Sequence, residues 1–139
     1  MHKTNKILNV KLSSVITGLR WGEVIIIADA GLPVPKGVET LDLSICEGKP
    51  VLEDILPLMK ESLTYDRVIV ATEMEKTNKK KFDYVKEMFS EKFETMGNLQ
   101  WEEEFLPKAK LVVQTGETSP YGNVIFVGGL DFFQLGMAD

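Results

Sequence analysis

Three carboxylates follow apolar stretches of the sequence that are typical of buried strands, and they are the first candidates for chemistry. Asp29 and Glu73 each come directly after such a stretch, and Glu117 follows a third, within Thr115-Gly-Glu117. Because the carboxyl ends of parallel strands meet at one edge of a sheet, we expect a polar site at that edge. The alternative is that each acid only ends a strand or caps the helix that follows.

Nucleophilic and metal-dependent chemistry find little support in the sequence. Cys46 and Ser119 would each need a histidine base, and the single histidine, His2, lies near the terminus. One cysteine and one histidine cannot assemble the usual zinc sites. The glycine patterns that hold nucleotide phosphates are also missing. We therefore predict no metal site, and we interpret Cys46 as a small packing residue rather than a reactive thiol.

The composition predicts a folded, acidic protein. Its 139 residues, 44% hydrophobic and 27% charged, fit one domain spanning residues 1–139. The formal net charge of −5 and pI near 5.0 would repel nucleic acid and anionic membranes, so we expect neither as a partner. No apolar run approaches the ~18 residues of a membrane span, and Met1–Val10 lacks the apolar core of a signal peptide. We expect a cytoplasmic protein.

The hydrophobic period alternates between helical spacing and short unbroken apolar runs, which predicts the order of the elements. Asn9 is a candidate cap for the first helix. Helices are predicted within residues 9–19, 50–63, 82–93 and 101–107, and strands at 24–28, 40–43, 67–72, 111–114 and 124–127. This order predicts a three-layer α/β fold, with a mostly parallel central sheet and helices on both faces.

Proline and lysine residues give further expectations. Residues 31–37 contain two prolines between glycines, which predicts a stiff loop. Pro50 suits a first helical turn, and Pro57 predicts a kink or a break in that helix. The run Lys79–Lys81 predicts a solvated surface, since the chain as a whole is acidic.

Several segments, in their order and spacing, resemble the D-ribose pyranase and fucose mutarotase family from Ile7 to about Gly129. They are Ile7-Leu-Asn9, Ile27-Ala-Asp29 with Gly31-Leu-Pro-Val-Pro35, Asp42-Leu-Ser44, Glu73 before Thr77-Asn78, and Thr115-Gly-Glu117 through Pro120-Tyr-Gly-Asn123. The resemblance implies a ribose-pyranase-like fold. It also implies a sugar mutarotase, an isomerase of carbohydrate metabolism that interconverts pyranose and furanose ribose, or the anomers of fucose.

The same resemblance implies the residues that would handle a free monosaccharide. Asp29 would contact the sugar and act in catalysis, while Tyr121 and Asn123, with Gly122 between them, would bind it. No cofactor is implied. A ring-like homo-oligomer, a pentamer or decamer with sites near subunit boundaries, is implied as well.

Two positions depart from the family. Trp21 stands where ribose pyranases carry a histidine described as the proton donor, and we place Trp101 at the second, sugar-binding histidine. The indole N–H donates a hydrogen bond but does not titrate, so Trp21 is not expected to transfer protons. Asp29 can act as a base, and a water, Tyr121 or a carboxylate with a pKa raised by burial can act as the acid.

Two other functions stay open from the sequence. A non-catalytic sugar-binding or sensor protein on the same fold would use Trp21 and Trp101 to stack on sugar rings. A structural or partner-binding subunit would use the apolar tail 130–135, which we expect to pack at a subunit contact. The sugar, the number of subunits and the general acid are not specified by the sequence.

Overall fold

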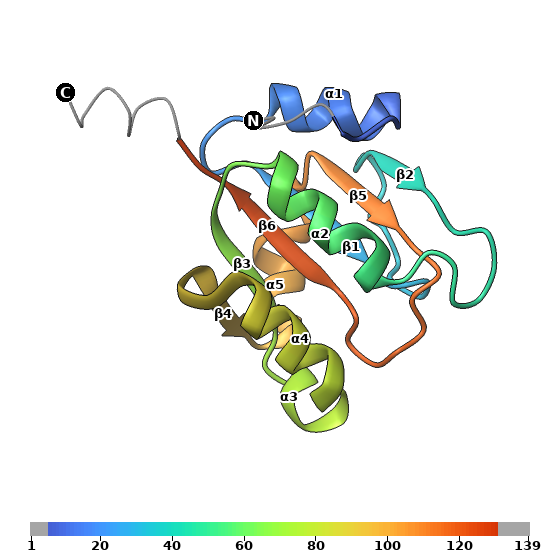
Figure 1. The fold of residues 1–139 in the computed structure, drawn as a ribbon, viewed down its shortest axis with the longest axis vertical. Helices are drawn as coiled ribbons and strands as arrows, with labels where there is room; N and C mark the ends of the chain where they lie inside the picture. Colours follow the sequence, from blue (N-terminus) through green and yellow to red (C-terminus); the bar gives the residue numbers. More distant parts are fainter. Residues whose placement is uncertain (1–5, 131–139) are drawn as a thin grey trace.

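A computed structural model describes residues 6–130, within which six strands form one sheet. The strands are β1 (Val24–Ala28), β2 (Thr40–Asp42), β3 (Tyr65–Ala71), β4 (Phe93–Met96), β5 (Leu111–Gln114) and β6 (Val124–Gly128). Their order across the sheet is β2-β5-β1-β6-β3-β4 (Figure 1). Five strands run in one direction, and β6 is antiparallel to both of its neighbours, β1 and β3. The sheet is therefore mixed and mostly parallel.

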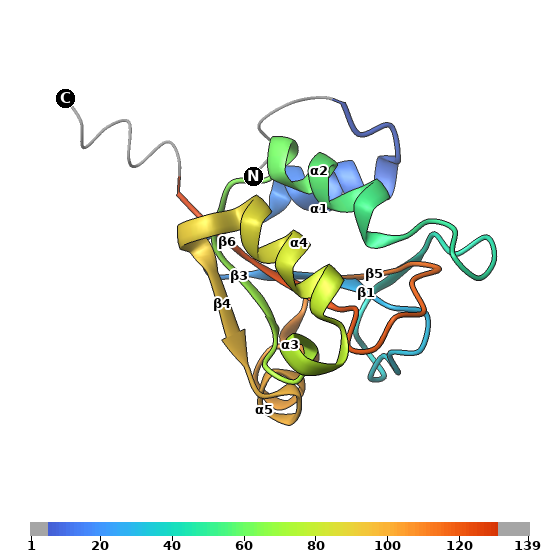
Figure 2. The ribbon, with the colours of Figure 1, turned by 60° about the horizontal axis from the view of Figure 1, so that its bottom comes forward.

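Helices cover both faces of this sheet. They are α1 (Val10–Gly18), α2 (Leu52–Ser62), α3 (Met74–Thr77), α4 (Lys79–Phe89) and α5 (Asn98–Glu104), with 3-10 turns at Ser90–Lys92 and Leu106–Lys108. Figure 2 shows α1, α2 and α4 on one side of the sheet and α5 on the other. The predicted three-layer α/β architecture is confirmed. Among the described residues, no helix has the length and apolar character needed to cross a membrane.

Two apolar cores lie on opposite faces of the sheet. Ile25 and Ile27 of β1 belong to the core beneath α1, α2 and α4, while Val24 and Ile26 belong to the core beneath α5. Every residue of β1 is buried, which explains the unbroken apolar run at 24–28. Full burial of each large aliphatic side chain contributes roughly 1.5–3 kcal/mol, so this strand is a central part of the fold.

The first helix begins as the sequence predicted. The Asn9 side chain accepts a hydrogen bond from the Leu12 backbone N–H at 2.9 Å, and α1 continues to Gly18. Such a cap typically stabilises a helix by ~1 kcal/mol. Leu12 and Ile16 then bury the apolar side of α1 in the first core.

Two proline predictions for the second helix, Pro50 in its first turn and a break at Pro57, are wrong, while a kink at Pro57 stays a prediction. Pro50 lies before α2, whose N-cap is Val51, and Pro57 lies inside α2 without breaking it. Pro57 removes one backbone hydrogen bond and is exposed. Leu56 and Met59 are fully buried on either side of it, so packing offsets the lost bond and the helix stays continuous.

The strand β4 and the short helix α3 were not predicted. The apolar spacing up to Phe93 suggested one long helix, but α4 ends at Phe89, and Ser90 adopts a left-handed conformation with φ of 49°. Phe93 instead begins β4, which pairs in parallel with β3 at the edge of the sheet. An edge strand that is only partly buried lacks the continuous apolar run that identified the central strands.

Candidate active site

The candidate site lies where β1 ends and β6 begins. Because these strands are antiparallel, with Ile27 paired to Val124, the residues after β1 and before β6 meet at one edge of the sheet. The Asp29 backbone N–H donates to Asn123 Oδ1 at 2.8 Å, and Asn123 Nδ2 donates to Asp29 Oδ2 at 3.2 Å. Asn123 is only 5% exposed, so this reciprocal pair holds the Asp29 carboxylate in one orientation.

The environment of Asp29 makes it a stronger base than an ordinary aspartate. Burial raises the pKa of Asp29, and the nearby Glu117 carboxylate acts in the same direction. Hydrogen bonds from Gly31, Asn123 and Leu32 oppose the shift, and the Gly31 N–H donates to Asp29 Oδ1 at 3.0 Å. The net pKa stays above the usual value for aspartate.

Tyr121 has an unusual backbone conformation beside this pair. Its φ is 55°, a left-handed value that bulky residues rarely adopt and that often marks a functional constraint. The Asn78 side chain donates to the Pro120 carbonyl at 2.9 Å, and the Asn123 N–H donates to the Tyr121 carbonyl at 2.8 Å. These bonds hold the segment on both sides of Tyr121, whose half-buried ring packs against both cores.

Asp29, Tyr121 and Asn123 line one cavity of about 270 Å³. A space of this size holds several waters or one small polar ligand. The other residues that line it are Gly31, Leu32, Pro33, Asn98 and Glu102. A neighbouring cavity of about 420 Å³ also borders Asp29 and is bounded by residues 117–120. The structure thus brings together the carboxylate, phenol and amide that the sequence singled out.

Glu117 is buried beside Asp29 in a network of donors. One of its oxygens accepts from the Leu52 N–H at 2.9 Å and from Lys81 Nζ at 3.1 Å, and the other accepts from the Ser119 hydroxyl at 2.6 Å. Burial alone would raise the pKa of Glu117, but these hydrogen bonds and the Lys81 charge outweigh it and lower the pKa. Glu117 therefore stays ionised while only 3% exposed.

The Lys81 partner corrects the prediction of a purely solvated lysine run. Its side chain is 16% exposed and lies between Glu117 and Glu53. The pKa of Lys81 is raised: burial lowers it, but the two carboxylates act more strongly together. The sequence did not indicate this contact because Glu117 and Lys81 lie 36 positions apart.

Gly122 is buried against Glu117 and is not among the residues that line the 270 Å³ cavity. A Cβ at this position would lie 2.9 Å from Glu117 Cγ and 3.1 Å from the Ser119 carbonyl oxygen. A glycine is needed here because the backbone passes close to the buried carboxylate. The position serves packing of the segment rather than direct contact within this cavity.

Trp101 does not have the exposed position that sugar stacking requires. Its side chain is 0% exposed in the core beneath α5, and its indole N–H donates to Asn98 Oδ1 at 2.9 Å. The expectation that Trp101 contacts a sugar is therefore corrected, since no face of the ring is free to stack. The residue instead anchors α5 to the sheet.

Trp21 lies in the turn before β1, whereas Asp29 follows the other end of that strand. Its ring is 64% exposed, and its indole N–H donates to Asp66 Oδ2 at 3.0 Å. Glu73 is not among the described residues that line the Asp29 cavity, and its carboxylate accepts from the Asn98 N–H at 3.0 Å at the start of α5. The Glu73 side chain therefore caps the start of α5 and makes no capping bond to α3, the helix that directly follows it.

Asn98 and Glu102 were missed by sequence reasoning although both line the Asp29 cavity. They lie four residues apart on α5, so they share one side of the helix. Positions 98, 101, 102 and 105 are spaced as i, i+3, i+4 and i+7, so all four lie toward one face of the helix. The sequence alone does not tell which of them are buried in the core, as Trp101 and Phe105 are, and which line the cavity.

Two further predictions concerned Cys46 and metal binding. Cys46 is exposed, so its interpretation as a packing residue is wrong. It lines a separate cavity of about 340 Å³ with residues of the 44–47 and 116–118 segments. Within residues 6–130, no group of histidine, cysteine and acidic side chains is arranged to hold a metal ion.

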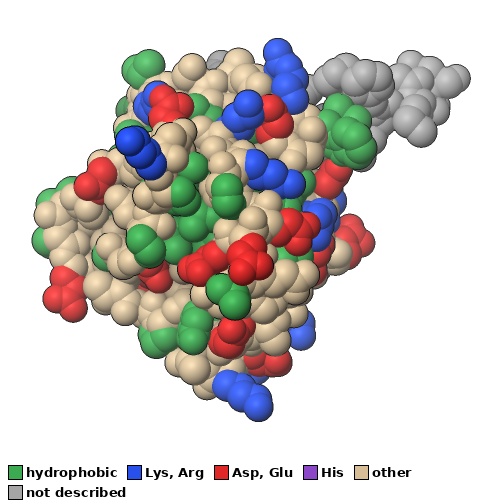
Figure 3. Space-filling view, turned by 180° about the vertical axis from the view of Figure 1, so that it is seen from behind, with side chains coloured by type: hydrophobic (Ala, Val, Ile, Leu, Met, Phe, Trp, Pro, Cys, Tyr) green, Lys and Arg blue, Asp and Glu red, His purple; other side chains and the backbone are tan. Residues whose placement is uncertain are grey.

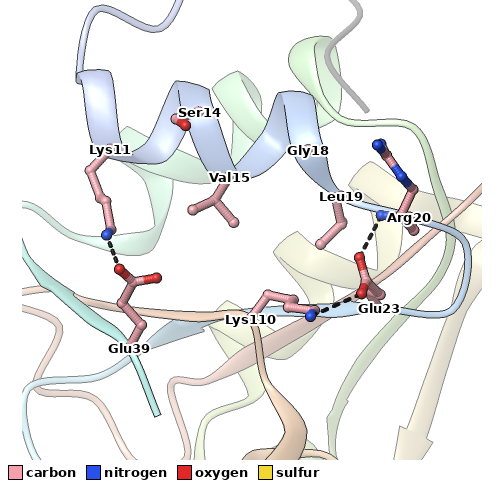
Figure 4. Close-up of a pocket in the computed structure, with 9 residues that line it drawn as sticks. All are labelled: Lys11, Ser14, Val15, Gly18, Leu19, Arg20, Glu23, Glu39 and Lys110. Atoms are coloured by element: carbon pink, nitrogen blue, oxygen red, sulfur yellow. Dashed lines mark hydrogen bonds and ion pairs between the residues drawn. The ribbon is translucent and has the colours of Figure 1, made fainter. Parts of the chain in front are cut away.

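A further cavity of about 380 Å³ lies beneath α1, at the opposite edge of the sheet from Asp29 (Figure 4). Glu23, Glu39 and Lys110 come just before β1, β2 and β5, and Lys11 lies in α1. Lys11 contacts Glu39, and Lys110 Nζ lies 3.1 Å from Glu23. These pairs join α1 and the strand ends, and we treat this cavity as separate from the candidate site.

The fold and the site define an α/β protein with a pocket for one small polar ligand at the carboxyl edge of its sheet. The chain belongs to the RbsD / FucU transport protein family, whose model matches residues 1–131. The resemblance inferred from the sequence is therefore confirmed.

Named relatives and solved structures agree with this membership. The D-ribose pyranase of Pseudomonas putida KT2440 is 36% identical, covering 94% of this chain and 99% of that protein. The D-ribose pyranase of Bacillus subtilis 168 is 38% identical with the same coverage. The structure of B. subtilis RbsD complexed with D-ribose matches with a TM-score of 0.87 and 35% identity over 92% of this chain and 98% of that one. The fucose mutarotase of Streptococcus pneumoniae, at 19% identity and a TM-score of 0.74 over 90% and 95% of the two chains, shares the fold.

Proposed function

We propose that this protein is a sugar mutarotase that interconverts the ring forms of a free monosaccharide, such as pyranose and furanose D-ribose or the anomers of L-fucose. The observation that carries the proposal is the convergence of Asp29, Tyr121 and Asn123 on one cavity. Support comes from D-ribose pyranases that are 36–38% identical over 94% of the chain. It comes also from the match to an RbsD structure that contains D-ribose. The reaction needs no cofactor.

Asp29 would act as the base in this reaction. Ring opening removes the proton of the anomeric hydroxyl, breaks the bond between C1 and the ring oxygen, and delivers a proton to that oxygen. The raised pKa of Asp29 suits it to take the first proton, since burial makes its carboxylate more basic. Closure by another hydroxyl, or onto the other face of C1, gives a new ring form.

Tyr121 and Asn123 would hold the sugar during these steps. A side-chain amide has two N–H groups, and one of those of Asn123 already donates to Asp29. The second is available to a sugar hydroxyl. The Tyr121 hydroxyl can donate or accept, so the pair can bind vicinal hydroxyls next to the reacting carbon.

The activity is tested by exchange NMR on D-ribose and L-fucose, comparing the protein, an Asp29→Asn variant and buffer alone. Loss of a general base typically lowers the rate ~10²–10⁴-fold, so we expect the variant to lose most of the acceleration. Equal rates with the wild-type protein and the variant would refute the assignment of Asp29. Equal rates with the wild-type protein and buffer would refute mutarotase activity itself.

A second candidate is a non-catalytic sugar-binding or sensor protein, and one observation favours it. Trp21, at the family's histidine position, presents an exposed indole that can stack on a sugar ring. Sugars are titrated against tryptophan fluorescence in the wild-type protein and in a Trp21→Phe variant. A signal that disappears in the variant, without ring interconversion, supports the sensor. Binding that is unchanged in the variant argues against it.

We also propose a cytoplasmic, ring-like homo-oligomer, a pentamer or decamer built from one domain per chain. Exposed large apolar side chains support an assembly because such surface is usually covered by a partner. Among the described residues they are Leu8, Val10, Trp21, Ile45, Leu58 and Leu99. Sedimentation at several protein concentrations measures the subunit number, and a monomer throughout would refute the assembly. The predicted packing of the tail 130–135 lies almost entirely outside the described residues, and a truncation after Gly129 that leaves the oligomer mass unchanged would count against it.

A further inference from the structure

We propose that Glu102 is the second catalytic carboxylate of the Asp29 cavity, and that the two carboxyl groups act as the acid and base of ring opening. This inference rests on the proposed mutarotase function and supplies the general acid that the family's histidine position lacks in this chain. The starting observation is that Glu102 and Asp29 line the same 270 Å³ cavity.

The helix α5 is oriented so that Glu102 faces this cavity. Asn98 and Glu102 lie one helical turn apart and both line it. Trp101 and Phe105, also four residues apart, are buried in the core on the sheet side of the helix. Rotation of α5 that turned Glu102 away would expose two aromatic rings, so the packing of the core fixes the direction of the carboxylate.

The position of α5 along its axis is also fixed. The Glu73 carboxylate accepts from the Asn98 backbone N–H at 3.0 Å, and Trp101 Nε1 donates to Asn98 Oδ1 at 2.9 Å. Figure 3 shows acidic side chains gathered beside apolar ones on the side of the molecule where α5 lies. Neither lysine nor arginine is among the described residues that line the Asp29 cavity, so no cation there neutralises the two carboxylates.

The other candidates for the general acid are less suited to the task. The Trp21 indole lies at the other end of β1 and cannot titrate. A phenol such as Tyr121 is a much weaker acid than a carboxyl group. Two carboxyl groups that share one proton can both donate and accept, which a reversible ring opening requires.

The proton balance of the pair closes over a full cycle. Ionised Asp29 takes the proton of the anomeric hydroxyl, the C1 to ring-oxygen bond breaks, and the ring oxygen takes its electron pair and the proton of Glu102. The product is the open-chain aldehyde, with Asp29 protonated and Glu102 ionised. In closure, Glu102 takes the proton of the attacking hydroxyl as its oxygen bonds to C1, and Asp29 returns its proton to the former carbonyl oxygen. Both groups are then reset.

The test compares Glu102→Gln with Glu103→Gln, a matched control at an exposed position of the same helix. Exchange NMR on D-ribose and L-fucose measures ring interconversion, and saturation-transfer NMR measures sugar binding. We expect Glu102→Gln to lose ~10²-fold or more of the rate with sugar binding largely kept, and Glu103→Gln to match the wild-type protein. Glu102→Asp should recover part of the lost rate.

The pH profile separates catalysis from packing. Asp29 must be ionised to act as the base, so the wild-type rate should fall at low pH, and Glu102→Gln should change this profile whereas Glu103→Gln should leave it unchanged. The titratable groups of this cavity are Asp29, Glu102 and Tyr121, and Glu117 acts on Asp29 from the neighbouring cavity.

The outcomes distinguish this inference from the proposed function. A wild-type rate in Glu102→Gln, together with an inactive Asp29→Asn, overturns the role of Glu102 and leaves the mutarotase proposal standing. Parallel loss of sugar binding and rate in Glu102→Gln also overturns the catalytic role. No acceleration by the wild-type protein overturns both proposals.

Discussion

Replacing Glu117 by glutamine should destabilise the protein strongly because it removes one partner of a buried ion pair. Glu117 joins the first turn of α2 through Leu52, α4 through Lys81, and the loop through Ser119. Glutamine keeps the shape and one acceptor, so the main change is loss of the negative charge. Lys81 is then left with Glu53 as its remaining carboxylate partner among the described contacts.

The magnitude follows from the burial of the two partners. Removing one member of a buried pair typically costs ~3–5 kcal/mol, because an uncompensated charge stays buried. Glu117 is almost fully buried, but Lys81 is 16% exposed and still contacts Glu53. We therefore expect the lower end, a loss of about 3 kcal/mol in the free energy of unfolding. Against a typical total of ~5–15 kcal/mol, this is a large fraction.

Equilibrium urea unfolding at fixed protein concentration measures this loss, with fixed concentration needed because assembly contributes to stability. Glu53→Gln is the control, since it removes the exposed partner of the same lysine and should cost less than ~1 kcal/mol. The double variant Lys81→Met with Glu117→Gln should be more stable than Glu117→Gln alone, because it removes the partly buried cation that has lost its buried carboxylate partner. The reasoning is refuted if Glu117→Gln costs no more than Glu53→Gln.

Three further predictions concern pH and packing. The pKa of Glu117 is lower in the folded protein than its ordinary value of 4.5. The ionised carboxylate therefore contributes stability above pH 4.5, and this contribution is lost as the pH falls through the folded-state pKa. The free energy of unfolding, measured at successively lower pH, should show this loss in the wild-type protein and not in Glu117→Gln. The pKa of Asp29 is raised above its ordinary value of 3.8, and the base must be ionised to act. The rate of ring interconversion should therefore begin to fall at a pH above 3.8 as the solution is acidified. An inflection of the rate at or below pH 3.8 would contradict this. Gly122→Ala should lower both the stability and the rate of ring interconversion, since the added Cβ would lie 2.9 Å from Glu117 Cγ. If the midpoint of urea unfolding and the rate were both unchanged, the close packing would be refuted.

Much of the fold could be predicted from the sequence because its central strands are buried on both faces. Val24–Ala28 is apolar over its whole length and Leu111–Gln114 over its first three residues, and the predicted bounds are those of β1 and β5. The helix after Asn9 was predicted because a cap and an apolar stripe agree. The partly buried strand β4 has neither signal, so its first residue, Phe93, continued the helical spacing of α4 and was assigned to the wrong element.

The site was only partly predictable. The sequence indicates which residues follow strands, but it does not indicate which side chains of distant segments face the same cavity. Asp29 could be chosen as a carboxylate that directly follows a buried strand. Its pairing with Asn123 depends on the antiparallel direction of β6, which no local pattern specifies. Trp101, Asn98 and Glu102 share one face of α5, so which of them lines the cavity depends on how the helix is rotated against the sheet.

The spacing between Asp29 and the segment that carries Tyr121 is set by backbone bonds as well as by side chains. The Thr115 N–H and hydroxyl both donate to the Ala28 carbonyl, at 3.1 and 2.8 Å, and the Ala30 N–H donates to the Glu117 carbonyl at 2.8 Å. These bonds lie on either side of Asp29, so the loop after β5 and the loop after β1 must move together. Since the Glu117 side chain ties the same loop to α2 and α4, loosening it should misplace the catalytic groups even where the fold survives. For Glu117→Gln we therefore expect a lower rate at temperatures well below unfolding, a loss that stability alone would not produce.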